Sequence, residues 1–335
     1  MEAGGKLSVR TNRMKVEKEG EIVGESGVIL DVTQGLSNRG LITSNDLTFI
    51  NTGSQIYNAG TGRIYGDHIA LKTRDLMNRE EEVNATTSAA VIVARDRLDI
   101  AAHKIVNREH ALLASEGDLV IGRSMNAAHR AVGKADKIDN GSATVSSVGN
   151  MVLGADRLRN LNLHFASEVR EVPGSRKTGV VEYLRDEGGD RNYYTPADIT
   201  DTGKRGVIYF KGMRTEDYYV MNFDYYERQP YVTSSDPAEI LAGGHLTLNT
   251  DETINDKSRI LANRITIEGA SVTNIDAEGE HREIRDGRRN YHYIGYKRGR
   301  KKSRWSGWKK YRRADVVTPI KLEVVYYQPD WRDAP

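Results

Sequence analysis

Residues 36–58, LSNRGLITSNDLTFINTGSQIYN, begin and end with the same short phrase: an aliphatic residue, any residue and an asparagine. The phrase returns 20 residues later, at 76–78, and several times further along the chain. Self-similarity on this scale is typical of repeat proteins, in which each repeat is one structural unit stacked on the next. The repeated asparagines are Asn38, Asn58, Asn78, Asn107, Asn140 and Asn160, with a weaker pair at Asn255 and Asn274.

A second apolar patch follows the asparagine and alternates apolar with polar residues. Examples are DLTF at 46–49 and HIAL at 68–71. Alternation with a period of two is typical of a short strand with one buried face, and glycine at the joints, as at Gly60 and Gly66, is typical of tight turns. Two or three short strands in about 20 residues predict one coil of a right-handed parallel β-helix, an all-β solenoid.

The repeated asparagine has a structural explanation in such a fold. Successive coils stack about 4.8 Å apart, so equivalent side chains form ladders along the stack. We expect the six asparagines to hydrogen-bond from coil to coil, as Asn ladders do in other stacked strands; the alternative for any single one is a turn residue. Leucine-rich and helical repeats fit less well, since their dense leucine pattern and 3.6-residue period are missing.

The repeats are interrupted twice. We expect coils over residues 1–161 and again over 238–277, with a tyrosine-rich insertion at 162–237 and a basic, aromatic segment with a final strand at 278–335. Of the 24 Phe, Trp and Tyr residues, 11 lie between 183 and 231 and 9 between 291 and 331, so the coils are aliphatic and the interruptions aromatic. Strand-like stretches in both predict two extended, β-hairpin-rich insertions on a binding face. We expect half of these aromatics to pack an accessory sheet and half to be exposed.

Composition excludes several classes of protein. The chain of 335 residues has no cysteine, which excludes a disulfide framework and a thiolate metal site. No apolar run approaches the roughly 18 residues of a membrane-spanning helix, and residues 1–5 lack the apolar core of a signal peptide. Because alternating sequence begins at once with KLSV at 6–9, we interpret the chain as a piece of a longer protein with an added Met1.

The net charge of +2 conceals an uneven distribution. Residues 281–313 hold 14 Lys and Arg against 2 Asp and Glu, a charge of +12, which leaves −10 for the remainder. Tyrosine and tryptophan are interleaved with these cations. Such a stretch suits phosphate groups, sugars or single-stranded nucleic acid, and it is also typical of a plain solvated loop.

Several phrases resemble the filamentous haemagglutinin-type exoproteins of two-partner secretion, and among them the CdiA family of contact-dependent growth inhibition. AAVIVARDRLDI at 89–100, IVNREHALLASEGDL at 105–119 and IDNGSA at 138–143 are similar to the end of the first haemagglutinin-repeat stalk. SDPAEILAGG at 235–244 and NDKS at 255–258 are similar to the part beyond it. The resemblance covers most of residues 30–280, whereas the two interruptions match the family only in position and general character.

The resemblance implies a function in interbacterial competition. In that family the stalk is a filament secreted through a CdiB-type outer-membrane transporter, tethered to the outer membrane and exposed on the cell surface. The region after the first stalk implies a receptor-binding tip that recognises an outer-membrane barrel protein or lipopolysaccharide of a neighbouring bacterium for toxin delivery. We therefore expect a monomeric adhesin that binds no nucleic acid. The alternative is a general haemagglutinin-like adhesin or structural spacer that binds anionic glycans.

Catalysis is the weakest alternative. Some β-helices degrade polysaccharides, which requires clustered carboxylates or a metal on neighbouring coils. Asp46, Asp67, Asp96 and Asp118 open several strands and could form an acidic stripe, but a turn-initiating aspartate is the simpler explanation. The eight histidines show no paired metal-ligand spacing. We expect no enzyme activity, no metal and no cofactor.

The candidate receptor contacts are the tyrosines, tryptophans and cations of the two interruptions, because Tyr, Trp and Arg are favoured at the centres of interfaces. They are Tyr193, Tyr194, Tyr218, Tyr219, Tyr225, Tyr226, Tyr291, Tyr293, Lys297, Arg298, Arg300, Lys301, Lys302, Arg304, Trp305, Trp308, Lys309, Lys310, Arg312 and Arg313.

Overall fold

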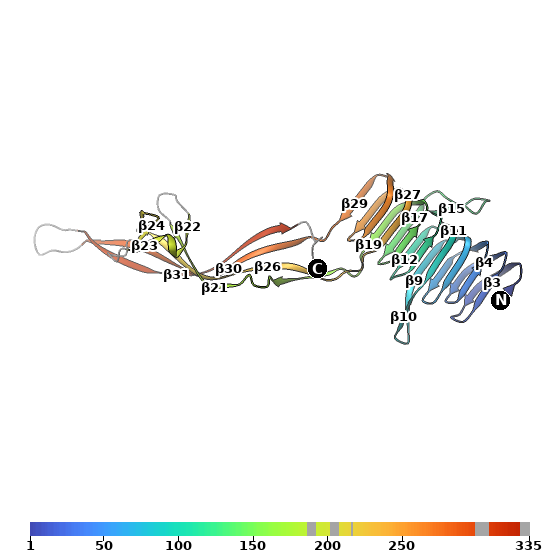
Figure 1. Cartoon of the computed structure of the whole chain (residues 1–335), viewed down its shortest axis with the longest axis horizontal. Coiled ribbons are helices and arrows are strands. Elements are labelled where there is room, and N and C mark those ends of the chain that lie inside the picture. Colours follow the sequence, from blue (N-terminus) through green and yellow to red (C-terminus); the bar gives the residue numbers. More distant parts are fainter. Residues whose placement is uncertain (186–191, 202–207, 216, 299–307, 329–335) are drawn as a thin grey trace, which may run out of the picture. The chain divides into compact units, whose positions relative to one another are not determined.

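The computed structural model describes residues 1–185, 192–201, 208–215, 217–298 and 308–328, the last segment and 293–298 by their backbone alone. It is almost entirely β, with 74% strand and 1% helix. The chain forms two compact units (Figure 1). The β-helix unit comprises Met1–Ala166 and Thr233–Ala277, and the extra-helical unit comprises Ser167–Val232 and Glu278–Pro335. The segments 162–166 and 233–237, which the sequence assigns to the insertion, thus belong to the β-helix unit.

The β-helix unit is a stack of coils, each made of short strands paired in parallel with the coils before and after it. One coil contains β5 (Leu41–Ser44), β6 (Leu47–Thr52) and β7 (Gln55–Ala59), which pair with β8 (Arg63–Lys72) and β9 (Asp75–Val83) of the next. This arrangement confirms the predicted parallel β-helix. The other strands of the stack are β1 (Glu2–Ala3), β2 (Lys6–Val16), β3 (Glu21–Gly24), β4 (Gly27–Asn38), β11 (Val91–Ala101), β12 (Lys104–Arg108), β13 (Leu112–Ser115), β14 (Asp118–Gly122), β17 (Ala135–Gly141), β18 (Thr144–Ser147), β19 (Met151–Leu161), β27 (Glu239–Asp256), β28 (Arg259–Glu268) and β29 (Ser271–Ile275).

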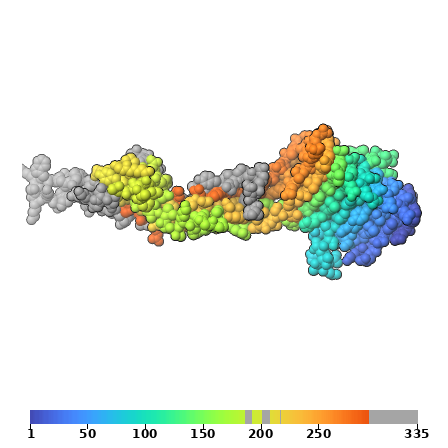
Figure 2. Space-filling view, in the orientation of Figure 1, coloured from blue at the N-terminus to red at the C-terminus, as the bar shows by residue number. Residues whose placement is uncertain are grey.

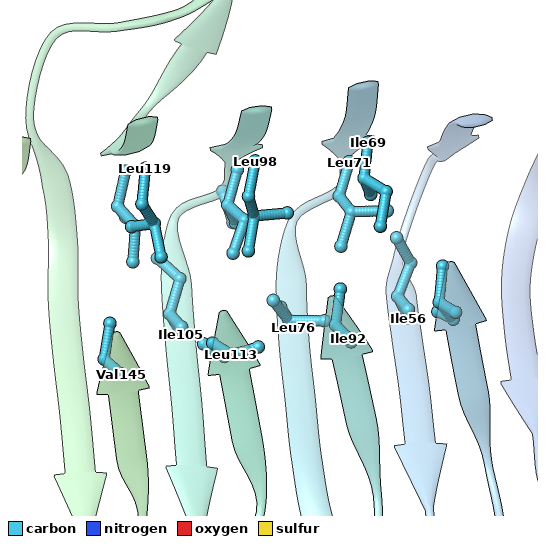
Figure 3. Close-up of a cluster of buried hydrophobic side chains, with 14 of the residues drawn as sticks. Ile56, Ile69, Leu71, Leu76, Ile92, Leu98, Ile105, Leu113, Leu119 and Val145 are labelled. Atoms are coloured by element: carbon cyan, nitrogen blue, oxygen red, sulfur yellow. The ribbon is translucent and has the colours of Figure 1, made fainter. Parts of the chain in front are cut away.

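Aliphatic ladders fill the interior of the stack (Figure 3). Ile69, Leu98 and Leu119 occupy equivalent positions in successive coils and are fully buried. A second ladder passes through Leu76 and Ile105, also buried. Each such side chain contributes roughly 2 kcal/mol by leaving water, and the parallel register requires the same residue type at each level. The alternating pattern of the sequence is the direct consequence.

The repeated asparagines form one continuous side-chain ladder. Asn38 Nδ2 donates to Asn58 Oδ1 at 2.8 Å, and each later member of the ladder up to Asn255 donates to the next in the same way. The side-chain amides of the ladder also donate to backbone carbonyls of a neighbouring coil. Asn107 Nδ2, for example, donates to Thr144 O at 2.9 Å. The further steps are Asn58 to Asn78 (2.9 Å), Asn78 to Asn107 (2.9 Å), Asn107 to Asn140 (2.9 Å), Asn140 to Asn160 (2.8 Å), Asn160 to Asn255 (2.8 Å) and Asn255 to Asn274 (2.7 Å).

Two hairpins explain the uneven spacing of the asparagines. The C-terminal half of β9 continues beyond the coil and pairs antiparallel with β10 (Thr86–Ala89), which separates Asn78 and Asn107 by 29 residues. Figure 2 shows this hairpin as a protrusion from the stack. A smaller hairpin of β15 (Ser124–Met125) and β16 (Ala131–Val132) lengthens the next step to 33 residues. The sequence analysis did not detect either hairpin.

The stack continues without a break across the long insertion. β19 pairs directly with β27, with Asn160 opposite Asn255, although 95 residues separate them in the chain. In Figure 1 the orange strand β27 accordingly lies next to the green strand β19. The insertion therefore leaves the stack between two coils and returns to it in register.

The extra-helical unit is built on one antiparallel sheet that joins both interruptions. Its strand order is β22-β21-β26-β30-β31, and β20 also pairs with β26. Hairpins form within both interruptions, as between β21 and β22 and between β30 and β31. The central pair, β26 and β30, comes from different interruptions, so the two combine into one sheet. The strands are β20 (Ala166–Glu171), β21 (Lys177–Arg185), β22 (Tyr193–Tyr194), β26 (Tyr218–Ser234), β30 (Gly279–Arg298) and β31 (Trp308–Gln328); a small sheet holds β23 (Ile199–Asp201), β24 (Ile208–Phe210) and β25 (Met213–Thr215), and η1 (Pro196–Asp198) is a single 3-10 turn.

Candidate interaction surface

Strand register in the extra-helical sheet brings tyrosines and arginines together. Tyr219 of β26 lies opposite Tyr291 of β30, and Tyr225 lies opposite Arg285. Directly opposite residues of antiparallel strands project on the same face of the sheet. Residues 219, 221, 223 and 225 share one face because side chains alternate along a strand. Arg289, opposite Met221, completes this aromatic and basic face.

The guanidinium groups lie against the aromatic rings. The Arg289 guanidinium carbon is 4.7 Å from the Tyr219 ring centroid, and the Tyr219 and Tyr291 centroids are 4.6 Å apart. Arg285 lies 5.6 Å from the Phe223 ring and 5.8 Å from the Tyr193 ring. Each cation–π contact contributes about 0.5–1 kcal/mol at a partly exposed site. We call the exposed and half-buried members of this group, Tyr193, Tyr219, Arg285, Arg289 and Tyr291, the Tyr–Arg face; Phe223 is only 2% exposed and belongs to the interior.

Two further cations lie on tyrosines near the start of β21. The Arg176 guanidinium is 4.2 Å from the Tyr226 ring, and Lys177 Nζ is 5.6 Å from the Tyr225 ring. Arg176 also makes two hydrogen bonds to Glu171, which lower the pKa of that carboxyl. Arg176 is therefore compensated by a carboxylate as well as by a ring.

Arg289 differs from Arg176 in its partners. Arg289 Nε is buried and makes no hydrogen bond within the part of the chain that the structure describes. Arg285 lies 3.9 Å from Glu182 Oε2, a long ion pair. A half-buried guanidinium that lies mainly on aromatic rings gains more from a new carboxylate or phosphate than one already paired with a carboxylate does. The Tyr–Arg face is therefore suited to an anionic or hydrogen-bond-accepting partner.

Tyr225 remains a hydrogen-bond donor over the whole physiological range. Burial, together with the hydrogen bond from its hydroxyl to Glu227 Oε1 at 2.9 Å, raises the pKa of Tyr225 to about 12. A tyrosine of ordinary pKa is neutral at pH 7 as well, so the shift widens the pH range over which the Tyr225 hydroxyl donates and leaves the charge at neutral pH unchanged.

Two of the predicted contact residues are core residues instead. Tyr194 and Tyr218 are only 6% and 3% exposed. Their rings pack against the buried Phe210, with centroids 4.8 Å and 5.9 Å from it, because the small sheet covers them. By contrast, Tyr193 is 52% exposed, and Tyr219, Tyr225, Tyr226 and Tyr291 are half-buried. Tyr194 and Tyr218 are therefore withdrawn from the candidate surface.

The basic stretch is only partly described. Residues 293–298 and 308–313 lie on the paired backbones of β30 and β31, with Lys297 opposite Lys309 and Arg298 opposite Trp308. The predicted contacts that fall there, with side chains outside the described part, are Tyr293, Lys297, Arg298, Trp308, Lys309, Lys310, Arg312 and Arg313. Arg300, Lys301, Lys302, Arg304 and Trp305 lie outside the described residues altogether.

The sequence analysis missed the cations that complete the surface. Arg176, Lys177, Arg285 and Arg289 were not among the predicted contacts, although all four lie on tyrosine or phenylalanine rings. Their only signal was two short clusters of basic residues, at 176–177 and 282–289. That signal becomes specific only when the strand register is known.

The candidate acidic stripe on the coils is not continuous. Asp118 lies in register with Arg97, and its Oδ1 accepts a hydrogen bond from the backbone of Asn150 at 2.9 Å, as a turn residue does. Within the described residues there is no group of three or more His, Asp or Glu side chains placed to hold a metal ion. In the same part of the chain, no helix has the length and apolarity to cross a membrane.

Comparison with known proteins returned no relative: no protein-family model, curated protein or solved structure matches this chain. The resemblance to CdiA exoproteins consequently stays a prediction from the sequence phrases. A proposal about function therefore depends on two structural features, the parallel β-helix and the Tyr–Arg face.

Proposed function

We propose that this chain is the receptor-binding part of a CdiA-type filament, a rigid β-helix that carries a separate binding unit. The observation that carries the proposal is the Tyr–Arg face. Two interruptions distant in the chain combine into one sheet, and that sheet collects tyrosines and arginines on one face. Tyrosine and arginine dominate the energetics of protein recognition.

The β-helix supports the proposal by its contrast with the inserted unit. Its interior is aliphatic, its asparagine ladder continues past the insertion, and its coils remain in register. A solenoid of this kind is stabilised by contacts between neighbouring coils. A stack of this kind is suited to be the rigid support of a binding unit at the cell surface.

The proposed partners follow from the predicted family. The receptor would be an outer-membrane barrel protein or lipopolysaccharide of a neighbouring bacterium, and the full-length protein would leave its own cell through a CdiB-type transporter. The chain would act as a surface-exposed, monomeric, non-catalytic adhesin in toxin delivery, without a cofactor.

Replacing Arg285 and Arg289 together by alanine is expected to weaken attachment of the full chain to target bacteria at least about tenfold. The substitution removes two guanidinium groups from a tyrosine-rich surface, and central arginines of an interface each contribute about 1–2 kcal/mol or more. Attachment is measured by flow cytometry of fluorescently labelled protein on a panel of Gram-negative cells.

The matched control is Arg259→Ala, which removes an exposed arginine of β28 in the β-helix unit, where it pairs with Glu239 at 3.4 Å. This variant is expected to attach like the parent chain. Unchanged attachment of the double variant, or an equal loss in the control, would remove the Tyr–Arg face from the proposal.

A general adhesin for anionic glycans is the second candidate, favoured by the cations of the same face. The salt dependence of attachment distinguishes the receptor-specific adhesin from the general one. Electrostatic attraction between exposed charges is screened within about 8 Å at physiological ionic strength. A specific receptor site keeps most of its affinity at about 0.5 M salt, whereas a nonspecific polycation loses it. Target strains that lack single barrel proteins, or that carry truncated lipopolysaccharide, then identify the receptor class.

A further inference from the structure

Both crossing segments of the insertion meet the same corner of the stack. The corner consists of Glu109 and His110 on one coil and Ser142 on the next, joined by backbone hydrogen bonds such as His110 N to Ser142 O at 2.7 Å. All three residues have positive φ, at 55°, 61° and 44°. Non-glycine residues rarely adopt this region, and such strain concentrates where function requires a particular geometry.

Ser142 binds both segments through one hydroxyl. Its Oγ donates to the carbonyl of Asp236 at 2.7 Å, where the chain returns to the stack, and accepts from the backbone N–H of Leu163 at 2.9 Å, where the chain leaves it. Asn162 and Ser235 join the two segments to each other through their side chains at 3.0 Å. These neutral bonds are independent of pH.

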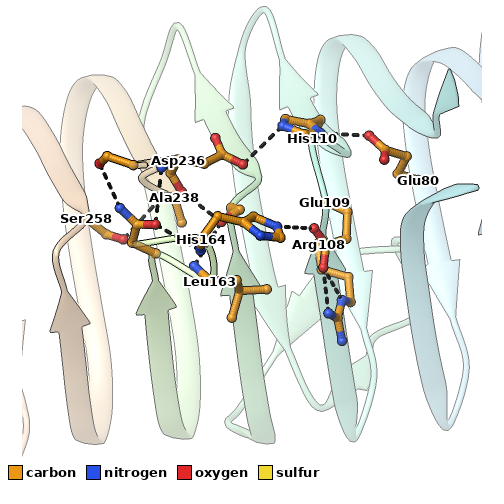
Figure 4. A network of polar contacts seen from close by, with 12 residues as sticks. Glu80, Arg108, Glu109, His110, Leu163, His164, Asp236, Ala238 and Ser258 are labelled. Carbon is orange, nitrogen blue, oxygen red and sulfur yellow. Dashed lines mark hydrogen bonds and ion pairs between the residues drawn. The ribbon is translucent and has the colours of Figure 1, made fainter. Parts of the chain in front are cut away.

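Charged side chains form a second set of bonds around the same corner (Figure 4). His110 Nδ1 lies 2.6 Å from Glu80 Oε2 on β9, and His110 Nε2 lies 3.0 Å from Asp236 Oδ2 on the returning segment. On the leaving segment, His164 Nε2 lies 2.7 Å from Glu109 Oε2. Arg108 binds the other oxygen of Glu109 at 2.6 Å.

The surroundings of His110 favour its positively charged form. A neutral imidazole carries one N–H and one lone pair, so it can donate to only one of two carboxylates. Here both ring nitrogens face carboxylate oxygens, at 2.6 Å and 3.0 Å. Asp236 Oδ2 is buried and makes no hydrogen bond among the described residues, so the ring at 3.0 Å stabilises this oxygen only through a positive charge. An imidazolium compensates both carboxylates, whereas a neutral ring with its proton on Nδ1 turns a lone pair toward Asp236.

We propose that Glu80, His110 and Asp236 form a charge-dependent clasp that fastens the returning segment of the insertion to the β9–β10 hairpin and the coil corner. The clasp closes when His110 is an imidazolium and loses one of its two arms when His110 is neutral. It adds a pH-sensitive element to the neutral bonds of Ser142. The leaving segment has its own arm, His164 on Glu109.

The direction of the pH dependence follows from the neighbours of His110. The hydrogen bond to Glu80, and the negative charges of Asp236, Glu80 and Glu109, outweigh partial burial and raise the pKa of His110. The clasp is therefore complete below the ordinary histidine pKa of about 6.5 and is lost as the pH rises through the raised value. Burial opposes the ionisation of Glu109, but hydrogen bonds from Arg108 and His164 outweigh it and lower the Glu109 pKa, so that this carboxylate stays charged over the same interval.

Hydrogen–deuterium exchange of the full chain tests the clasp. After correction for the intrinsic pH dependence of exchange, we expect peptides covering 233–240 to exchange about fivefold faster at about pH 9 than at about pH 6. His110→Gln is expected to exchange fast at both pH values, because glutamine carries no titratable charge. The matched control is His103→Gln, which removes a histidine whose pair with Asp136 (3.5 Å) lies away from the insertion.

Nitrogen chemical shifts of the His110 ring test the clasp in the parent chain, without any substitution. In the parent chain, nitrogen chemical shifts of the His110 ring at about pH 6.5, the ordinary histidine pKa, are expected to show both nitrogens protonated. A neutral single tautomer at that pH would overturn the clasp. So would a pH dependence of 233–240 that persists unchanged in His110→Gln, or one that disappears equally in His103→Gln.

Discussion

Replacing Asn107 by alanine is expected to lower the free energy of unfolding of the β-helix unit by about 4 kcal/mol. Asn107 is 1% exposed, accepts from Asn78 and donates to Asn140, each at 2.9 Å. Its loss orphans Asn140 Oδ1 and one N–H of Asn78. An unsatisfied buried polar group costs about 2 kcal/mol, and water has no access to this interior position. Urea unfolding followed by circular dichroism measures the change.

Asn274→Ala is the matched control, because Asn274 ends the same ladder on an exposed position of β29. Asn255, its neighbour, keeps a second hydrogen bond to Ser258 O at 2.8 Å and is reached by solvent. The expected loss is below about 1 kcal/mol. Equal losses in the two variants would show that the ladder stabilises the coil by its turn geometry rather than by its buried hydrogen bonds.

Replacing Gly287 by alanine is expected to open the sheet of the extra-helical unit. Gly287 lies opposite Phe223, where β30 pairs with β26. A Cβ at this position would lie 2.2 Å from Asn222 O and 2.4 Å from Phe223 Cα, so the two strands must separate. Overpacking of this severity costs about 3 kcal/mol. Exchange of β26 peptides should rise about a hundredfold, while peptides of β11 to β14 in the β-helix unit keep their protection.

Gly179→Ala tests whether steric overlap, rather than loss of glycine, causes this effect. Gly179 of β21 has a φ of 63°, but a Cβ there would meet no atom within 4 Å. The expected cost is about 1 kcal/mol, the penalty of a side chain in the left-handed region. Accelerated exchange throughout the β-helix unit of Gly287→Ala would contradict the division of the chain into two separately stabilised units.

The coil could be predicted from sequence because each repeat carries its own evidence. The phrase around Asn58 and the alternation at 68–71 recur at nearly constant spacing, and stacked coils require equivalent residues at equivalent positions. The β9–β10 and β15–β16 hairpins could not be predicted, because each occurs once and its sequence is not repeated along the chain. They appear in the sequence only as longer intervals after Asn78 and Asn107.

The candidate surface was predictable only in part. Clustering of tyrosine, tryptophan and arginine located it in the two interruptions, and the sequence also indicated that some of the aromatics would be buried. Which ones are buried depends on contacts distant in the chain. Phe210 of β24 packs on Tyr218 of β26 and on Tyr194 of β22, and these residues share no local pattern that distinguishes them from the exposed Tyr193.

The amino-acid sequence alone determined the parallel β-helix and the position of its interruptions, because a solenoid is specified by contacts between neighbouring repeats that each repeat encodes locally. Only the tertiary structure decided that Tyr219 meets Tyr291 and that Arg289 lies on Tyr219. Pairing between strands so distant in the chain depends on the side-chain fit of the whole sheet, and a shift of register by one residue would send every side chain to the other face.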